Sequence, residues 1–113
     1  MDQLSEDYIR KNKDKINWCL ISAYQKLSEK IIRDYQDKVD WFWISANQKL
    51  SKEFIKEFKY KIHFKILLQR FGYTVYYNFE NYQIKFGNYC SEYLEFDEFV
   101  DLVIKLISLK AFK

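Results

Sequence analysis

Residues 4–26 read LSEDYIRKNKDKINWCLISAYQK, and residues 27–49 read LSEKIIRDYQDKVDWFWISANQK. The two segments are identical at 13 of 23 positions, and a diverged third copy begins at Leu50 with LSKEFIKEFKYKIHF. A period of this length is typical of stacked repeats, in which each unit buries its apolar face on its neighbours. The repeat therefore predicts an extended binding surface and not a catalytic pocket.

Each copy is predicted to form a hairpin of two short helices. Apolar residues shared by the first two copies should pack between units: Leu4/Leu27, Ile9/Ile32, Ile16/Val39, Trp18/Trp41 and Ile21/Ile44. Residues that suit helix N-caps precede each expected helix: Ser5, Ser28 and Ser51 for the first helices, Asn17 and Asp40 for the second. The second helices are then expected over residues 18–26 and 41–49.

Copy three follows the repeat only to about Phe64. Because His63 replaces the second cap, residues 51–71 can form one amphipathic helix, although two helices stay open. Its buried stripe would recur every four residues: Phe54, Phe58, Ile62 and Ile66. We expect the helix to end at Gly72 in a left-handed conformation.

The apolar period changes to two after Gly72, as in half-buried strands. Strands are predicted over residues 73–79, 82–86 and about 90–96, with turns at residues 80–81 and 87–88. Asp97 should then cap a helix over residues 98–110.

The predicted fold class is α+β: an N-terminal stack of short-helix repeats, a small antiparallel β-meander and a C-terminal helix. The repeat region covers residues 1–72, divided into repeats 4–26, 27–49 and 50–72. Residues 73–113 hold the meander and the last helix, and we expect them to pack with the repeats as one unit.

The residue inventory argues against an enzyme. Two isolated glycines cannot form a phosphate-binding loop, and the single histidine, His63, cannot supply a pair of metal ligands. Cys19 and Cys90 lack metal or redox spacing, so we expect reduced, packed thiols. No catalytic residue, metal or cofactor is predicted. Without a leader or an apolar run of membrane length, we expect a cytoplasmic protein that has no membrane partner.

The positive charge is concentrated in the repeats. Residues 1–72 hold 15 Lys and Arg against 10 Asp and Glu, whereas residues 73–113 hold 4 against 6. Basic residues in copy three have the spacing of one helix face, and we name them the basic stripe: Lys52, Lys56, Lys59, His63 and Arg70. The stripe could contact phosphates or an acidic protein surface, or it could be a solvated face paired with Glu53 and Glu57.

Aromatic residues offer a second candidate surface. Trp43 lies two residues beyond Trp41, so the two rings should point in different directions and differ in burial. Trp43 and Tyr24 are therefore predicted to anchor a protein partner, and the alternative is that these rings only fill the stack.

The second copy contains the pattern L-S-E-x-x-I-R-x-x-x-D-K-V-x-W-x-x-I-S-x-x-Q-K. This pattern resembles a short repeat in proteins of phages and large DNA viruses, over roughly residues 4–64. The resemblance implies a viral or mobile-element origin, and no catalytic residues are carried over. Small phage proteins of this size often resemble stoichiometric inhibitors of host defence, including anti-CRISPR proteins.

Three functions follow as hypotheses. The first is a non-enzymatic phage-type inhibitor that binds a host protein or ribonucleoprotein, in the cytoplasm of a bacterial host or infected cell. The second is direct binding of DNA or RNA through the basic stripe. The third is a self-associating module that forms a homodimer through the helix over residues 98–110.

Overall fold

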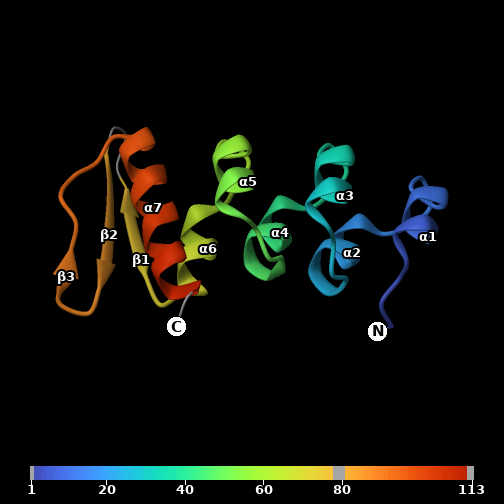
Figure 1. Ribbon diagram of the computed structural model, residues 1–113, viewed down its shortest axis with the longest axis horizontal. Coiled ribbons are helices and arrows are strands. Elements are labelled where there is room, and N and C mark those ends of the chain that lie inside the picture. Colours follow the sequence, from blue (N-terminus) through green and yellow to red (C-terminus); the bar gives the residue numbers. More distant parts are fainter. Residues whose placement is uncertain (1, 78–80, 112–113) are drawn as a thin grey trace. The chain divides into compact units, whose positions relative to one another are not determined.

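The computed structural model describes residues 2–77 and 81–111 (Figure 1). It confirms the α+β class, with short helices first, then a three-stranded antiparallel sheet and a final helix. The chain divides into two units, Met1–Leu50 and Ser51–Lys113. The division therefore lies at the end of the second repeat, whereas the sequence predicts a boundary at residue 72.

The first unit contains two helical hairpins, one from each of the first two repeats. Their helices are α1 (Glu6–Lys11), α2 (Trp18–Tyr24), α3 (Glu29–Asp34) and α4 (Trp41–Asn47). All four predicted caps are confirmed, because each cap side chain accepts a first-turn backbone N–H: Ser5, Asn17, Ser28 and Asp40. The second helices end two residues earlier than predicted, at Tyr24 and Asn47. The residues that follow, Gln25 and Gln48, have extended backbones.

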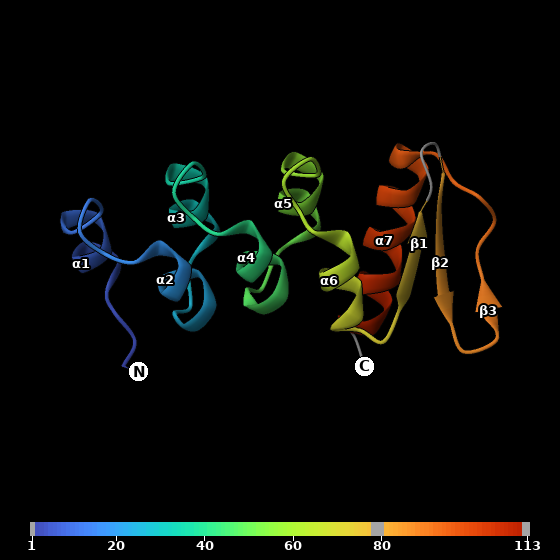
Figure 2. The ribbon, with the colours of Figure 1, turned by 180° about the vertical axis from the view of Figure 1, so that it is seen from behind.

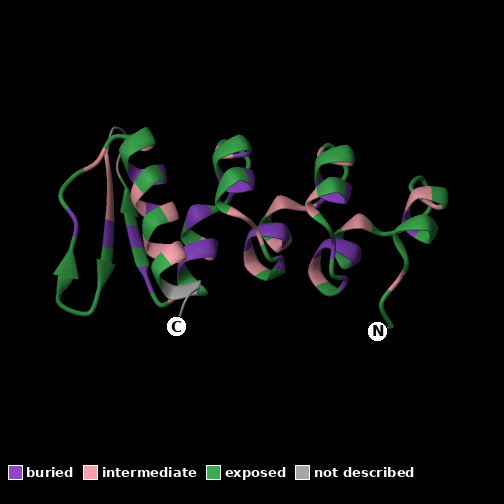
Figure 3. Ribbon diagram, in the orientation of Figure 1, coloured by how far each residue is buried: buried purple, intermediate pink, exposed green. Residues whose placement is uncertain are grey.

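Within this unit the equivalent helices lie side by side, α1 beside α3 and α2 beside α4 (Figures 1 and 2). Figure 3 shows buried bands on each of these helices. Among the predicted apolar positions, four are only partly buried: Leu4, Ile16, Trp18 and Trp41. Ile9, Ile21, Ile32 and Ile44 are all buried. Burial of these side chains supplies the apolar contribution that holds hairpins of only six or seven residues per helix, which are too short to be stable alone.

Two buried glutamines bind the backbone segment that leads into a repeat. Leu27 N donates to Gln48 Oε1 at 3.0 Å, and Gln48 Nε2 donates to the backbone oxygens of Gln25 at 2.6 Å and Ser22 at 2.9 Å. Gln25 repeats the arrangement one copy earlier, with Leu4 N at 2.6 Å and Asp2 O at 3.0 Å. Gln48 thus satisfies backbone groups where the first repeat joins the second, and Gln25 does so where the chain enters the first repeat.

In the second unit, copy three keeps the hairpin, so the prediction of one long helix is wrong. It forms α5 (Lys52–Glu57) and α6 (Phe64–Gln69). The turn between them repeats that of copy two, because Lys61 N and Ile62 N donate to Phe58 O as Lys38 N and Val39 N donate to Tyr35 O. Of the apolar residues predicted to be buried in copy three, Phe54, Phe58 and Ile62 are buried and Ile66 is partly buried. Gly72 has the predicted left-handed backbone, with φ 86°.

The sheet has the order β1-β2-β3. Its strands are β1 (Thr74–Tyr77), β2 (Tyr82–Phe86) and β3 (Tyr89–Cys90), with Val75 opposite Ile84. Gly87 turns the chain between β2 and β3 at φ 57°. The predicted third strand is shorter than expected and is followed by a single bridge between Tyr82 and Leu94. The turn predicted at residues 80–81 lies partly outside the described residues.

The last helix, α7 (Phe96–Ala111), begins two residues before the predicted start. Asp97 lies in its first turn and is not the cap, since the Glu98 carboxylate accepts the backbone N–H of Glu95. Buried Phe99, Val100 and Val103 form the core of this unit together with Ile84 and Val75. A homodimer through α7 stays a prediction.

Candidate binding surfaces

The helices α2 and α4 form a face without charge, which we name the uncharged row. Their sequences, WCLISAY and WFWISAN, contain no charged residue. Nevertheless Leu20 is 43%, Tyr24 66% and Phe42 38% exposed. Two neighbouring helices therefore present apolar and aromatic side chains to solvent, and exposed apolar surface is a common feature of interaction sites.

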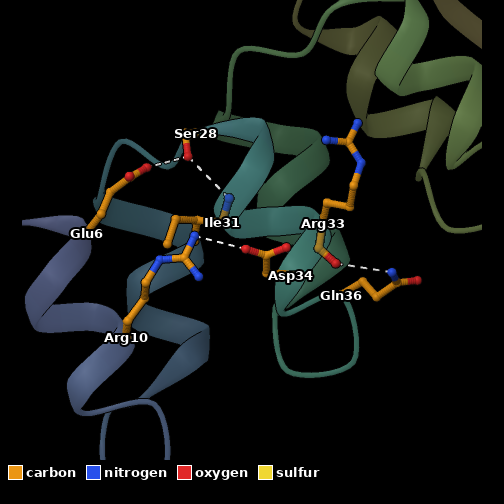
Figure 4. Close-up of polar contacts among 7 residues, drawn as sticks. All are labelled: Glu6, Arg10, Ser28, Ile31, Arg33, Asp34 and Gln36. Carbon is orange, nitrogen blue, oxygen red and sulfur yellow. Dashed lines mark hydrogen bonds and ion pairs between the residues drawn. The ribbon is translucent and has the colours of Figure 1, made fainter.

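The helices α1 and α3, in contrast, carry charged side chains that pair with one another. Arg10 and Asp34 form an ion pair at 2.9 Å, and the Ser28 hydroxyl donates to Glu6 (Figure 4). The hydrogen bond to Asp34 raises the pKa of Arg10. Charged residues of these two helices are therefore used to join one repeat to the next.

The structure corrects the predicted burial of the tryptophans. Trp18 and Trp41 are only partly buried, and each indole N–H donates at 2.9 Å to a backbone oxygen of its own hairpin turn, Lys13 and Gln36 respectively. Trp43 is also partly buried and packs edge-on against Phe42, with ring centroids 5.1 Å apart. Trp41 and Trp43 were expected to differ in burial, but both are partly buried. Trp43 supports the exposed Phe42 ring.

The basic stripe does not form a continuous positive surface. Lys59 Nζ lies 2.8 Å from Asp97 Oδ1, and Lys56 Nζ lies 4.0 Å from Asp101 Oδ1. Lys52 and Lys56 line a shallow pocket of about 240 Å³ together with Glu53 and Asp101. Carboxylates of α7 and α5 therefore offset much of the charge that the sequence placed here.

The break after α5 separates the remaining members of the stripe. Spacings of four and three residues align side chains only along one continuous helix, and α5 ends at Glu57. His63 is the first residue before α6 and makes no side-chain cap bond. The Arg70 guanidinium lies 5.8 Å from the Phe71 ring, and desolvation lowers its pKa.

Asp97→Asn is expected to lower the pKa of Lys59 toward the ordinary lysine value, because the hydrogen bond to Asp97 raises it. A folded-state pKa above the unfolded value favours the folded state at neutral pH. This contribution is lost as the pH rises through the raised pKa. An NMR titration of the Lys59 side chain between about pH 9 and 12 measures the shift. Asp101→Asn is the control and should leave the Lys59 titration unchanged.

Chemistry-bearing residues do not gather in the described part of the chain. Among residues 2–77 and 81–111, no group of three His, Cys, Asp or Glu residues is placed to hold a metal ion. Cys19 and Cys90 are free thiols, but both are exposed, so the expectation of packed thiols is wrong. Within the same residues, no helix is long and apolar enough to cross a membrane.

Sequence reasoning missed two groups of residues. Gln25 and Gln48 belong to the identical positions of the repeat, and that identity was the available signal. A tyrosine-lined pocket on the sheet arises from strand pairing and had no local signal.

Comparisons with protein-family models, with curated proteins and with solved structures each found no match to the chain.

Proposed function

We propose that this chain is a non-enzymatic binding protein whose uncharged row contacts a protein partner. The observation that carries this proposal is the absence of charge from both α2 and α4, combined with the exposure of Leu20, Tyr24 and Phe42. Protein interfaces are depleted of charge at their centres and enriched in aromatic residues. Rigid repeat scaffolds commonly present such surfaces.

The rim of the uncharged row indicates the chemistry of the partner. Lys26 and Lys49 occupy the same repeat position, two residues beyond the ends of α2 and α4, and both are exposed. In the part of the chain that the structure describes, no carboxylate lies within ion-pair distance of either ammonium group. A partner with an apolar segment and flanking acidic residues would complement this surface.

A protein of this kind acts by occupying a surface of its target. We propose a phage-type inhibitor of a host defence protein or ribonucleoprotein as the form of this function, by analogy with small phage proteins of this size. Direct nucleic-acid binding through the basic stripe ranks second, because Asp97 and Asp101 already pair with two of its lysines.

Photo-crosslinking tests the surface even while the partner is unidentified. A benzoylphenylalanine placed at Tyr24 or Phe42 should give one discrete protein adduct in a bacterial lysate. The same probe at Tyr8, an exposed aromatic position on α1, is the matched control and should give no such adduct. With the partner purified, Tyr24→Asp and Phe42→Asp should each weaken binding by about tenfold or more, while Tyr8→Asp has little effect.

Two outcomes contradict the proposal. One is an equal adduct at Tyr8, and the other is a partner whose affinity falls with Lys52→Gln and Lys56→Gln but not with the aromatic variants. The second result, together with a steep loss of affinity as salt rises, would favour the nucleic-acid alternative.

A further inference from the structure

The sheet of the second unit has one covered face and one open face. Helix α7 packs on the covered face, where Tyr82 stacks on Phe99 with centroids 4.7 Å apart and Ile84 is fully buried. Because side chains alternate along a strand, residues between these positions point to the other face. Thr74, Tyr76, Gln83 and Lys85 have that alternation and are exposed or partly exposed.

A pocket of about 190 Å³ opens on this sheet. Among the described residues, its lining consists of uncharged side chains with polar groups: Tyr76, Tyr77, Asn81, Gln83 and Tyr93. Tyr76 is 51% and Tyr93 67% exposed. Within the described residues, neither ring stacks on another aromatic side chain. Two tyrosine faces are therefore available to a flat ligand.

The irregular third strand places Tyr93 beside the other two strands. Ser91 N donates to Ile84 O, and Tyr82 and Leu94 exchange two backbone hydrogen bonds at 2.8 and 2.9 Å. Two residues of the third segment thus lie opposite Gln83, as in a β-bulge. Because Leu94 pairs with the inward-facing Tyr82, the neighbouring Tyr93 side chain points to the open face.

Gln83 provides hydrogen-bonding groups at the floor of this pocket. Its Nε2 donates to Ser91 O at 3.1 Å, which holds the amide in place. An amide carries a second N–H and an acceptor oxygen, and no other hydrogen bond of the Gln83 side chain occurs in the described residues. A positioned amide of this kind can contact the polar edge of a planar ring.

Two charged side chains lie on the same face, Lys85 and the exposed Glu92, which is the other residue of the bulge. Lys85 follows Gln83 by two residues on β2, so both side chains point the same way, and Lys85 is exposed. Within residues 2–77 and 81–111, no carboxylate lies within ion-pair distance of its ammonium group. This face therefore presents exposed aromatic rings, a positioned amide and a cation, the groups with which proteins contact base faces, base edges and phosphates.

From this juxtaposition we infer that the open face of the sheet binds single-stranded nucleic acid. Bases stack on Tyr76 and Tyr93, Gln83 contacts a base edge, and Lys85 contacts the phosphate backbone. Stacking on exposed rings of an open sheet is a general way to bind single strands, because every base offers a flat face. Duplexes hide those faces, so they should bind poorly. This inference is independent of the proposed protein interface, which lies in the other unit.

Fluorescence anisotropy of the full chain with labelled oligo-dT and oligo-U of roughly 12 nucleotides tests the inference. Tyr76→Ala and Tyr93→Ala should each weaken binding about tenfold, whereas Tyr76→Phe and Tyr93→Phe should retain most of the affinity. Lys85→Gln should reduce the salt slope by about one phosphate contact. These side chains are exposed, so the midpoint of thermal unfolding should not change.

Tyr60→Ala is the matched control, because Tyr60 is 80% exposed but stacks on Phe96 at 5.4 Å. It should leave the affinity unchanged. The inference is overturned if neither oligonucleotide binds, or if a duplex of the same length binds equally well. It is also overturned if Lys52→Gln and Lys56→Gln remove binding while the tyrosine variants do not. A synthetic peptide or soluble oligosaccharide that binds the tyrosine pocket in place of the oligonucleotides would equally overturn it.

Discussion

Ile31→Ala is expected to lower the free energy of unfolding by about 3 kcal/mol. Ile31 is 0% exposed and lies in α3, beside α1 of the preceding repeat. Polar contacts join the two copies around it, Arg10 to Asp34 and Ser28 to Glu6 (Figure 4). Truncation leaves a cavity between packed helices that cannot readily collapse. Denaturant-induced unfolding of the full chain, followed by far-UV circular dichroism, measures the loss.

Tyr8→Ala is the matched control, since Tyr8 occupies the same repeat position in copy one. Tyr8 is 49% exposed, because within the described residues no repeat lies against that face of α1. The expected loss is below about 1 kcal/mol. A loss at Tyr8 as large as that at Ile31 would show that this position serves its own hairpin and does not face the preceding copy.

The hairpins of the first two repeats could be predicted because their signals are local. An N-cap side chain bonds a backbone N–H only two or three residues away, so Ser5 or Asp40 marks a helix start whatever surrounds it. The apolar period then identified Ile9, Ile32 and Ile44 as core residues, and all three are buried.

Copy three shows where local signals end. The second cap is replaced by His63, which makes no side-chain cap bond, yet the helix still breaks. The turn is made by backbone bonds to Phe58 O, and burial of Ile62 and Phe64 holds the two sides together. The prediction that the basic stripe lies on one helix face is wrong for the same reason, since it assumed an unbroken helix. Two acidic partners of the stripe, Asp97 and Asp101, lie on a segment distant in the sequence. Binding through the stripe stays a prediction.

The tyrosine pocket could not be predicted from sequence. Tyr76 and Tyr93 are brought together only by strand pairing and by the extra residue in the third segment. The apolar alternation after Gly72 predicted half-buried strands, and the paired residues Val75 and Ile84 are buried on one face. It could not show that the opposite face stays uncovered, because the side on which α7 packs is a property of the whole unit.

Gln48→Met is expected to destabilise the chain by about 3 kcal/mol, although methionine has a similar size. The Gln48 amide serves three buried backbone groups, Leu27 N–H and the carbonyls of Ser22 and Gln25. A buried backbone group that loses its partner costs about 1–3 kcal/mol. Since methionine fills the space, the loss reports hydrogen bonding and not a cavity. Thermal and denaturant unfolding of the full chain provide the measurement.

Gln25→Met makes the same chemical change one repeat earlier, where the partners are Leu4 N–H and Asp2 O in a part-buried segment. Water can reach these groups once the first residues separate, so the expected cost is only about 1 kcal/mol. Amide hydrogen exchange should then show faster opening of Leu4 in Gln25→Met and of Leu27 in Gln48→Met.

Two buried serines belong to the same arrangement, since Ser22 Oγ accepts the backbone N–H of Asp40 and Ser45 Oγ donates to Trp41 O. Ser22 and Gln48 therefore join the two repeats alongside the apolar packing, whereas the Ser45 bond lies within α4. This arrangement predicts that Gln48→Met lowers the free energy of unfolding more than Gln25→Met does. Equal losses of stability would contradict this account, in which the contribution of each glutamine depends on how deeply its backbone partners are buried.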